Sequence, residues 1–147
     1  MIIDYFDVKG YFEGHRYHDL KARKYSAIFR NIEEFIDPNI INIFYPKNMF
    51  VDGKDLEIYI FLESKILRGR VLDNNITEIK ILYLKDLKDF ICECTFDEEY
   101  HHKLTLKFYN DEVIVLDSLV DTNYSWKYKF EKEIKEIIQI IIDKNDI

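Results

Sequence analysis

Residues 126–143 read WKYKFEKEIKEIIQIIID, and this stretch decides the fold. Apolar residues recur in it three or four positions apart, which places them on one side of a helix of 3.6 residues per turn. They are Trp126, Phe130, Ile134, Ile137, Ile138, Ile141 and Ile142. The pattern predicts an amphipathic helix from about Tyr128 to Asp143. Since a helix of this length is marginal alone in water, we expect the apolar stripe to pack on a sheet of the same chain.

The middle of the chain, from residue 41 to residue 119, is typical of antiparallel β-structure. Apolar and polar residues alternate in it, and turn residues such as Asp52-Gly53 and Asn110-Asp111 separate the runs. The predicted strands cover residues 41–45, 49–51, 56–62, 66–72, 76–84, 90–96, 104–109 and 113–119. Gly69 interrupts one of them and indicates a bulge or a close approach. The segment predicts a curved antiparallel sheet, or a partly closed barrel, of about seven strands.

The N-terminal part combines two patterns. Residues 2–12 are rich in aliphatic and aromatic side chains, and they predict extended structure with a hairpin turn at Lys9-Gly10. The period then becomes helical, which predicts a helix from Asp19, its N-cap, to Ile36. Asp37-Pro38 stops that helix. A break near Asn31 into two shorter helices is the alternative.

This order of elements resembles two known fold families. One is the pleckstrin-homology-like barrel, a bent sheet of seven strands plugged by a C-terminal helix. The other is the helix-grip fold, in which an N-terminal strand, two short helices and six strands precede a helix over a cavity. The expected C-terminal helix is short for a helix-grip fold. We therefore expect a single α+β domain over residues 1–147, pleckstrin-homology-like, with the helix-grip fold as the alternative.

Composition narrows the class of function. The formal net charge is -7, and 48% of the residues are hydrophobic, which indicates a folded acidic domain. Negative charge repels phosphate backbones and anionic lipid surfaces, so we expect no generic nucleic-acid binding and no membrane binding. His15-Arg16 and residues 21–24 form the densest basic patch, which we interpret as a solvated helix face. The absence of a signal-like or spanning apolar run predicts a cytoplasmic location.

The side chains most able to carry chemistry near the middle of the chain are two cysteines and two histidines: Cys92, Cys94, His101 and His102. The cysteines alternate with Phe90 and Phe96, so we predict that they are buried, reduced core residues. A metal or redox role for the four side chains is the alternative. The spacing C-x-C-x6-H-H matches no common zinc pattern, and we therefore expect no metal and no cofactor.

No motif indicates catalysis. The serines lie outside nucleophile motifs, and there is no glycine-rich phosphate loop. His15 and His18 are expected to be exposed or locally hydrogen-bonded. Arg68 and Arg70 lie two residues apart, hence on one sheet face. They are predicted either to form cross-strand ion pairs, with carboxylates such as Glu57 available, or to contact an anion or a partner.

The sequence therefore predicts a small acidic interaction module without catalytic activity, which binds a protein partner and possesses no cofactor. Self-association into a homodimer is compatible with the pattern. An acidic inhibitor or immunity-type protein, which blocks a nucleic-acid-processing or defence enzyme, is the first alternative, because its charge would complement a basic site. A small-ligand-binding protein with a cavity between the sheet and the helix is the second.

Overall fold

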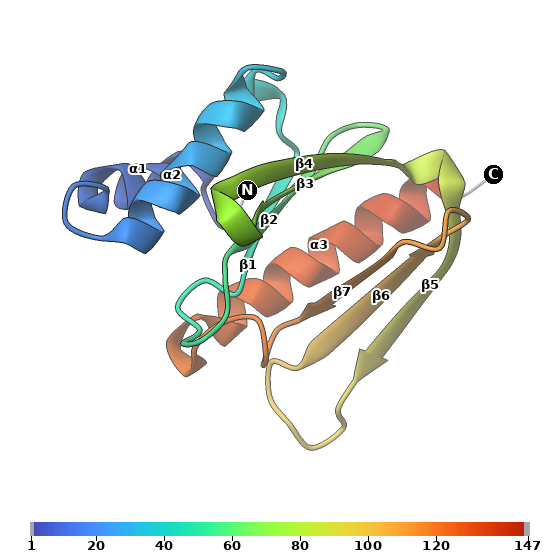
Figure 1. Ribbon diagram of the computed structural model, residues 1–147. Coiled ribbons are helices and arrows are strands. Elements are labelled where there is room, and N and C mark those ends of the chain that lie inside the picture. The colour runs from blue at the N-terminus through green and yellow to red at the C-terminus, as the bar shows by residue number, and fades with distance from the viewer. Residues whose placement is uncertain (1, 146–147) are drawn as a thin grey trace.

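The computed structural model describes residues 2–145 (Figure 1). Its helices are α1 (Tyr5–His15), α2 (Leu20–Glu33) and α3 (Lys127–Asn145), with single 3-10 turns η1 (Pro38–Ile40), η2 (Asp73–Asn75), η3 (Leu84–Asp86) and η4 (Tyr124–Trp126). The strands are β1 (Ile43–Lys47), β2 (Glu57–Phe61), β3 (Lys65–Leu72), β4 (Ile76–Tyr83), β5 (Leu87–Cys94), β6 (His102–Phe108) and β7 (Val113–Asp117). The described chain is thus α+β, as the sequence predicts.

The strands form two antiparallel sheets rather than one closed barrel. One sheet has the order β1-β2-β3-β4 and the other β5-β6-β7. At one seam β4 continues into β5 through η3. At the other seam side chains and loops join β1 to β7: the Asn48 amide donates to the Asp121 carbonyl at 2.8 Å, and the Tyr45 hydroxyl donates to the Asp121 carboxylate at 2.7 Å. Pro46 has no N–H to donate and is accommodated because β1 is an edge strand.

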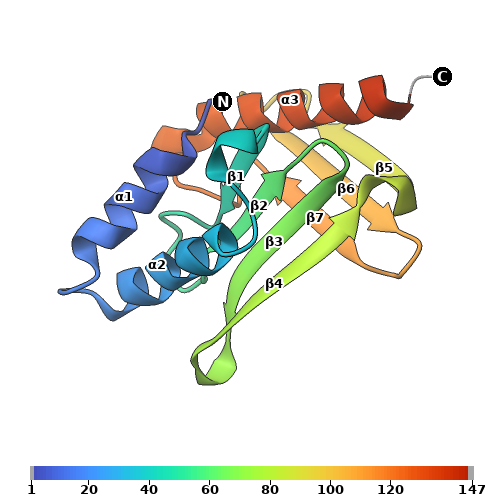
Figure 2. The same cartoon turned by 90° about the horizontal axis from the view of Figure 1, so that it is seen from above.

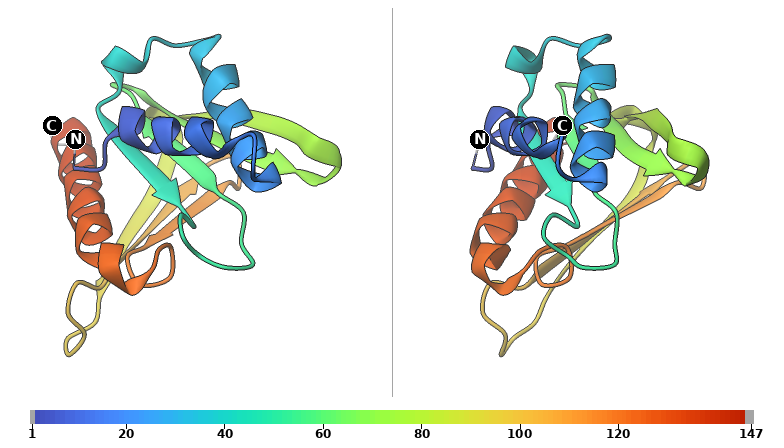
Figure 3. Two further views of the ribbon diagram at one scale, coloured as in Figure 1. Left: turned by 90° about the vertical axis from the view of Figure 1, so that its left-hand side faces the viewer. Right: turned by 60° about the vertical axis from the view of Figure 1, so that its left-hand side comes forward.

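The helices cover different sides of the sheets (Figures 2 and 3). α2 packs on β3 and β4, and α1 packs on α2. α3 packs on β1, β6 and β7, so it covers the seam at which the two sheets approach each other.

The C-terminal helix confirms the expected packing. Phe130, Ile134, Ile137 and Ile141 are at most 1% exposed and belong to the apolar core. The Phe130 ring meets the Tyr45 ring of β1 edge-on, with 5.0 Å between the centroids. Trp126 precedes the helix, in η4, and is only partly buried. The space between α3 and the sheets is therefore occupied by the side chains of the stripe.

The N-terminal segment differs from the prediction, because residues 5–15 form a helix and not a hairpin. The Asp4 carboxylate caps α1 by accepting hydrogen bonds from the Phe6 and Asp7 amides at 2.8 and 3.1 Å. Tyr5, Val8 and Phe12 are the buried residues of α1, and their spacing of three and four is helical. The sequence predicts extended structure here because aromatic residues have a high β-propensity, and three buried positions give only a weak helical pattern.

Three other features of the chain can be compared with the sequence prediction: the start of α2, the segment at residues 49–51, and Gly69. α2 begins as predicted, with the Asp19 carboxylate accepting from the Lys21 amide at 2.9 Å, and it runs unbroken through Asn31. The strand predicted over residues 49–51 is absent: residues 48–50 form a turn, with positive φ angles of 70° at Asn48 and 65° at Phe50. At Gly69 a close approach is confirmed, because a Cβ atom there would lie 2.6 Å from Ile28 Cγ2.

Candidate functional site

The exposed strand β5 is the most unusual surface of the described chain. Residues 88–94 are all exposed, whereas β6 and β7 each bury alternate residues. β5 is also an edge strand: within residues 2–145, β6 pairs with one edge of it and no strand pairs with the other. Figure 1 shows it as the outermost strand of its sheet. An edge of this kind presents unpaired backbone N–H and C=O groups.

The register of β5 on β6 assigns its side chains to two faces. Phe90 and Cys92 stand opposite Leu106 and Leu104, two buried core residues, while Ile91 stands opposite Thr105 on the outer face. Phe90 is nevertheless 38% exposed and Ile91 41% exposed. The inner face of β5 is therefore an uncovered continuation of the apolar core.

The prediction that the two cysteines are buried is wrong. Cys92 and Cys94 are free and exposed, not buried. Their alternation with Phe90 does place them on the core-facing side, because Cys94 stands opposite His102 and Cys92 opposite Leu104. The helix above that face, α3, packs on β6, β7 and, across the seam, β1. Since a helix is about 10 Å wide and strands are about 4.8 Å apart, it covers about two strands of the three-stranded sheet. The third strand, β5, is left uncovered.

α3 packs on β6, the strand next to β5, and its two ends lie near the two ends of β5. Near the start of α3, Glu131 holds His102 of β6, whose cross-strand partner is Cys94 at the end of β5. Near the end of α3, Ile141 lines a surface cavity together with Leu84 and Lys85, which lead into β5. The strip formed by Phe90, Cys92 and Cys94 is thus bordered on one side by β6, on which α3 packs, and on the other by a free backbone edge.

Strand β5 and the tip of its hairpin are strongly acidic. Between residues 86 and 99 there are six carboxylates and one lysine, which leave a net charge of -5. Three of the carboxylates, Asp97, Glu98 and Glu99, are consecutive and exposed at the hairpin tip, beside the fully exposed Phe96. Over the whole hairpin, residues 86–108, Lys103 and Lys107 of β6 reduce the net charge to -3, so the negative charge lies on β5 and the tip rather than on β6.

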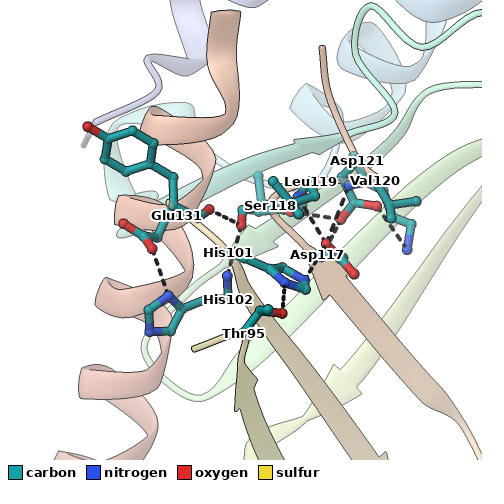
Figure 4. A network of polar contacts seen from close by, with 12 residues as sticks. Thr95, His101, His102, Asp117, Ser118, Leu119, Val120, Asp121 and Glu131 are labelled. Carbon is teal, nitrogen blue, oxygen red and sulfur yellow. Dashed lines mark hydrogen bonds and ion pairs between the residues drawn. The ribbon is translucent and has the colours of Figure 1, made fainter. Parts of the chain in front are cut away.

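A polar network fastens the loop end of the hairpin, where β6 begins, to its surroundings (Figure 4). The Nδ1 atom of His102 lies 2.8 Å from the Glu131 carboxylate of α3. The Ser118 hydroxyl, which is buried after β7, accepts from the His102 amide at 2.9 Å and donates to the Tyr100 carbonyl. These contacts tie the β5–β6 hairpin to α3 and β7, so β5 is held in place although it is uncovered.

His101 lies between Thr95 and Asp117. A hydroxyl, an imidazole and a carboxylate in this order are the residue types of a catalytic nucleophile, its base and the acid that orients the base. The details favour a structural role. His101 Nε2 is 3.3 Å from Asp117 Oδ1 without hydrogen-bond alignment. That same oxygen accepts from the amides of Leu119 and Val120, which caps the turn after β7. We therefore interpret the group as a clamp on the hairpin.

Arg68 and Arg70 take part in a second network, between the sheets. Arg68 contacts Glu78 at 3.2 Å and Glu112 at 3.3 Å, and Arg70 contacts Glu78 at 2.8 Å. The hydrogen bond from Lys80 to Glu112, with Arg68 close by, holds the pKa of Glu112 below its ordinary value. The two arginines therefore form the predicted cross-strand ion pairs.

The partner carboxylates come from β4 and from the turn before β7, not from the preceding strand. Glu57 stands opposite Arg70 in register, yet its side chain accepts from the Tyr59 hydroxyl at 3.1 Å. Arg68 is only 5% exposed, and contact of Arg68 and Arg70 with an anion or a partner remains a prediction.

His15 and His18, the remaining candidate residues from the sequence, take no part in these two networks. His15 Nδ1 contacts the Tyr11 carbonyl at 2.7 Å, and His15 and His18 are both exposed. Among residues 2–145, no group of three His, Cys, Asp or Glu side chains is arranged to hold a metal ion. No helix in that range is both long and apolar enough to cross a bilayer.

A family model described as "Protein of unknown function (DUF3908)" matches residues 4–132. No curated protein matches the chain, and no solved structure does.

Proposed function

We propose that this chain, which belongs to the DUF3908 family of proteins of unknown function, is an interaction module that adds an extended basic segment of a partner protein to the free edge of β5. The single observation that carries the proposal is a core-facing strand that is exposed over residues 88–94 and unpaired at one edge. Strand addition supplies main-chain hydrogen bonds, and alternate side chains supply specificity.

The other sheet edges support this mode less well. β1 contains Pro46, and its end is bound to Asp121. β7 has five residues and lies under α3. β4 is long, but its Glu78 and Lys80 side chains are engaged in ion pairs with neighbours. By contrast, β5 has eight residues, contains neither proline nor glycine, and carries a single lysine, Lys88.

The charge of the hairpin specifies the chemistry of the partner. A net charge of -5 over residues 86–99 attracts a cationic segment and accelerates its association. Pairing of β5 with β5 of a second copy would bring two such hairpins together, and the like charges would repel. A basic heterologous partner is therefore favoured over a homodimer through this edge. The inhibitor or immunity-type reading is a special case, in which the basic partner is an enzyme that handles nucleic acid.

We also propose that the fold is pleckstrin-homology-like. Two N-terminal helices, four plus three antiparallel strands and a closing C-terminal helix support a pleckstrin-homology-like arrangement with an open barrel. The helix-grip alternative requires a strand before the two helices, and none is present in residues 2–145. Its ligand cavity would also lie under α3, where core side chains pack.

The proposal can be tested by selecting binders from a displayed library of random 12-residue peptides. We expect the selected sequences to be rich in lysine and arginine, alternating with apolar residues, and their binding to weaken as salt rises. Selection of acidic sequences, or of sequences without preference, would contradict the proposal.

Proline substitutions give the structural control. Successive residues of a strand direct their amides to opposite edges, so one of Phe90→Pro and Ile91→Pro removes a free-edge N–H and leaves the β6 ladder intact. That variant should keep its melting temperature and lose the selected peptides. The paired charge variants are Glu98→Lys, which should weaken binding, and Glu34→Lys on the distant end of α2, which should not. Full binding by both proline variants would exclude strand addition at β5.

A further inference from the structure

A second surface, on the other sheet, combines a cavity with unpaired positive charge. The cavity has a volume of about 430 Å³ and lies between α2 and the β3–β4 hairpin. From α2 it is lined by Arg23, Lys24 and Arg30, and from the hairpin by Val71 and Thr77. Arg23 and Lys24, two residues of the basic patch expected to be a solvated helix face, thus border a hollow.

The helix geometry explains the hollow. Arg23, Ala27 and Arg30 are separated by four and three residues, so they share one face of α2. Ala27, the short side chain between the two arginines, leaves room where a longer residue would fill the space. Val71 and Thr77 are cross-strand partners and form the opposite wall. The result is a small apolar floor with cations along its rim.

The cations at this cavity differ from three cations of the neighbouring strands β3 and β4. Arg68, Arg70 and Lys80 each contact a carboxylate. Among the ion pairs of residues 2–145, none involves Arg23, Lys24 or Arg30. In a chain of net charge -7, three neighbouring cations without a carboxylate partner leave a local site that attracts an anion.

We propose that this cavity binds a small phosphorylated molecule, with the phosphate on Arg23, Lys24 and Arg30 and the remainder on Ala27 and Val71. Two guanidinium groups and an ammonium group match the charge and the several acceptor oxygens of a phosphate monoester. The volume lies within the range of small-molecule sites, about 300–1,000 Å³. A nucleic-acid polymer fits poorly, because its remaining phosphates would meet the acidic surface of the protein. The site lies on the sheet that does not contain β5, so it is independent of the proposed function.

Binding can be measured on the full chain with defined probes. Inorganic phosphate, glucose 6-phosphate, AMP and ATP are added at 1 mM in thermal-shift assays, with glucose and adenosine as unphosphorylated counterparts. We expect at least one phosphorylated probe to raise the melting temperature and its counterpart to have no effect. Arg23→Gln and Arg30→Gln should each weaken the affinity for that probe about tenfold or more in calorimetry, because each removes charge-assisted hydrogen bonds.

Lys107→Gln is the matched control, since it removes one exposed positive charge from the other sheet. It should leave the affinity unchanged. Arg23, Arg30 and Lys107 are all exposed. We therefore expect the melting temperatures of the three ligand-free variants to match that of the parent. The proposal is overturned if no phosphorylated probe shifts the melting temperature, or if the Lys107→Gln variant loses affinity as much as the Arg23→Gln and Arg30→Gln variants.

Discussion

Truncation of Ile134 to alanine should destabilise the protein strongly, because α3 is held by the burial of its stripe. Ile134 is fully buried between α3 and the sheets. Deleting such a side chain beyond Cβ costs about 2–5 kcal/mol, from lost transfer free energy and the cavity that remains. The unfolding entropy of a 147-residue chain is about 0.3 kcal/mol per kelvin. The melting temperature should therefore fall by about 6–16 °C.

Calorimetric or circular-dichroism melting of the parent, of Ile134→Ala and of three comparison variants provides the assay. Lys135→Ala on the solvent side should change little, since Lys135 forms only an exposed contact of 3.4 Å with Glu131. Ile142→Ala, at a position that is 44% exposed, should have a small effect, and Ile138→Ala an intermediate one. A melting temperature of Ile134→Ala equal to that of the parent would refute the intramolecular docking of α3.

Three other predictions address the core, the pH dependence and the surface charge. Gly69→Ala should destabilise the protein by about 1–3 kcal/mol in denaturant titrations, because its new Cβ would lie 2.6 Å from Ile28 Cγ2. Burial raises the pKa of Glu133 to about 7, from an ordinary 4.5, so the stability that its protonated form contributes is complete below about pH 4.5 and is lost as the pH rises through 7. Glu133→Gln should therefore raise the melting temperature more at pH 8 than at pH 5, and equal effects at the two pH values would contradict this assignment. Finally, titration with generic DNA at about 150 mM salt should show no binding tighter than ordinary non-specific affinity, about 10⁻⁴–10⁻⁶ M.

Prediction from sequence succeeded where one periodic pattern extends over many residues. The stripe of α3, the N-cap Asp19 and the run of strands from β2 to β7 all follow from spacing and turn residues. The N-terminal helix was missed because aromatic residues dominate it, and its three buried positions are too few to outweigh their β-propensity.

For the candidate site, the sequence predicts which face of the strand each side chain occupies, but not that this face is exposed. Alternation correctly placed Cys92 and Cys94 on the core-facing side of a strand, but alternation does not reveal whether a helix covers that strand. That depends on the path of α3, a tertiary property. The one local signal was the carboxylate-rich tip at Asp97, Glu98 and Glu99, since charge at an edge is how proteins keep an exposed strand from pairing indiscriminately.

Hydrogen exchange of the backbone amides, followed with and without a selected basic peptide, tests the central claim most directly. If the peptide pairs with β5, the exchange of amides in residues 87–94 should slow markedly on binding, while exchange in α2 and in β4 should stay as it is in the free protein. Protection that falls on another element, with β5 exchanging at its free rate in the saturated complex, would contradict the claim that β5 is the binding edge.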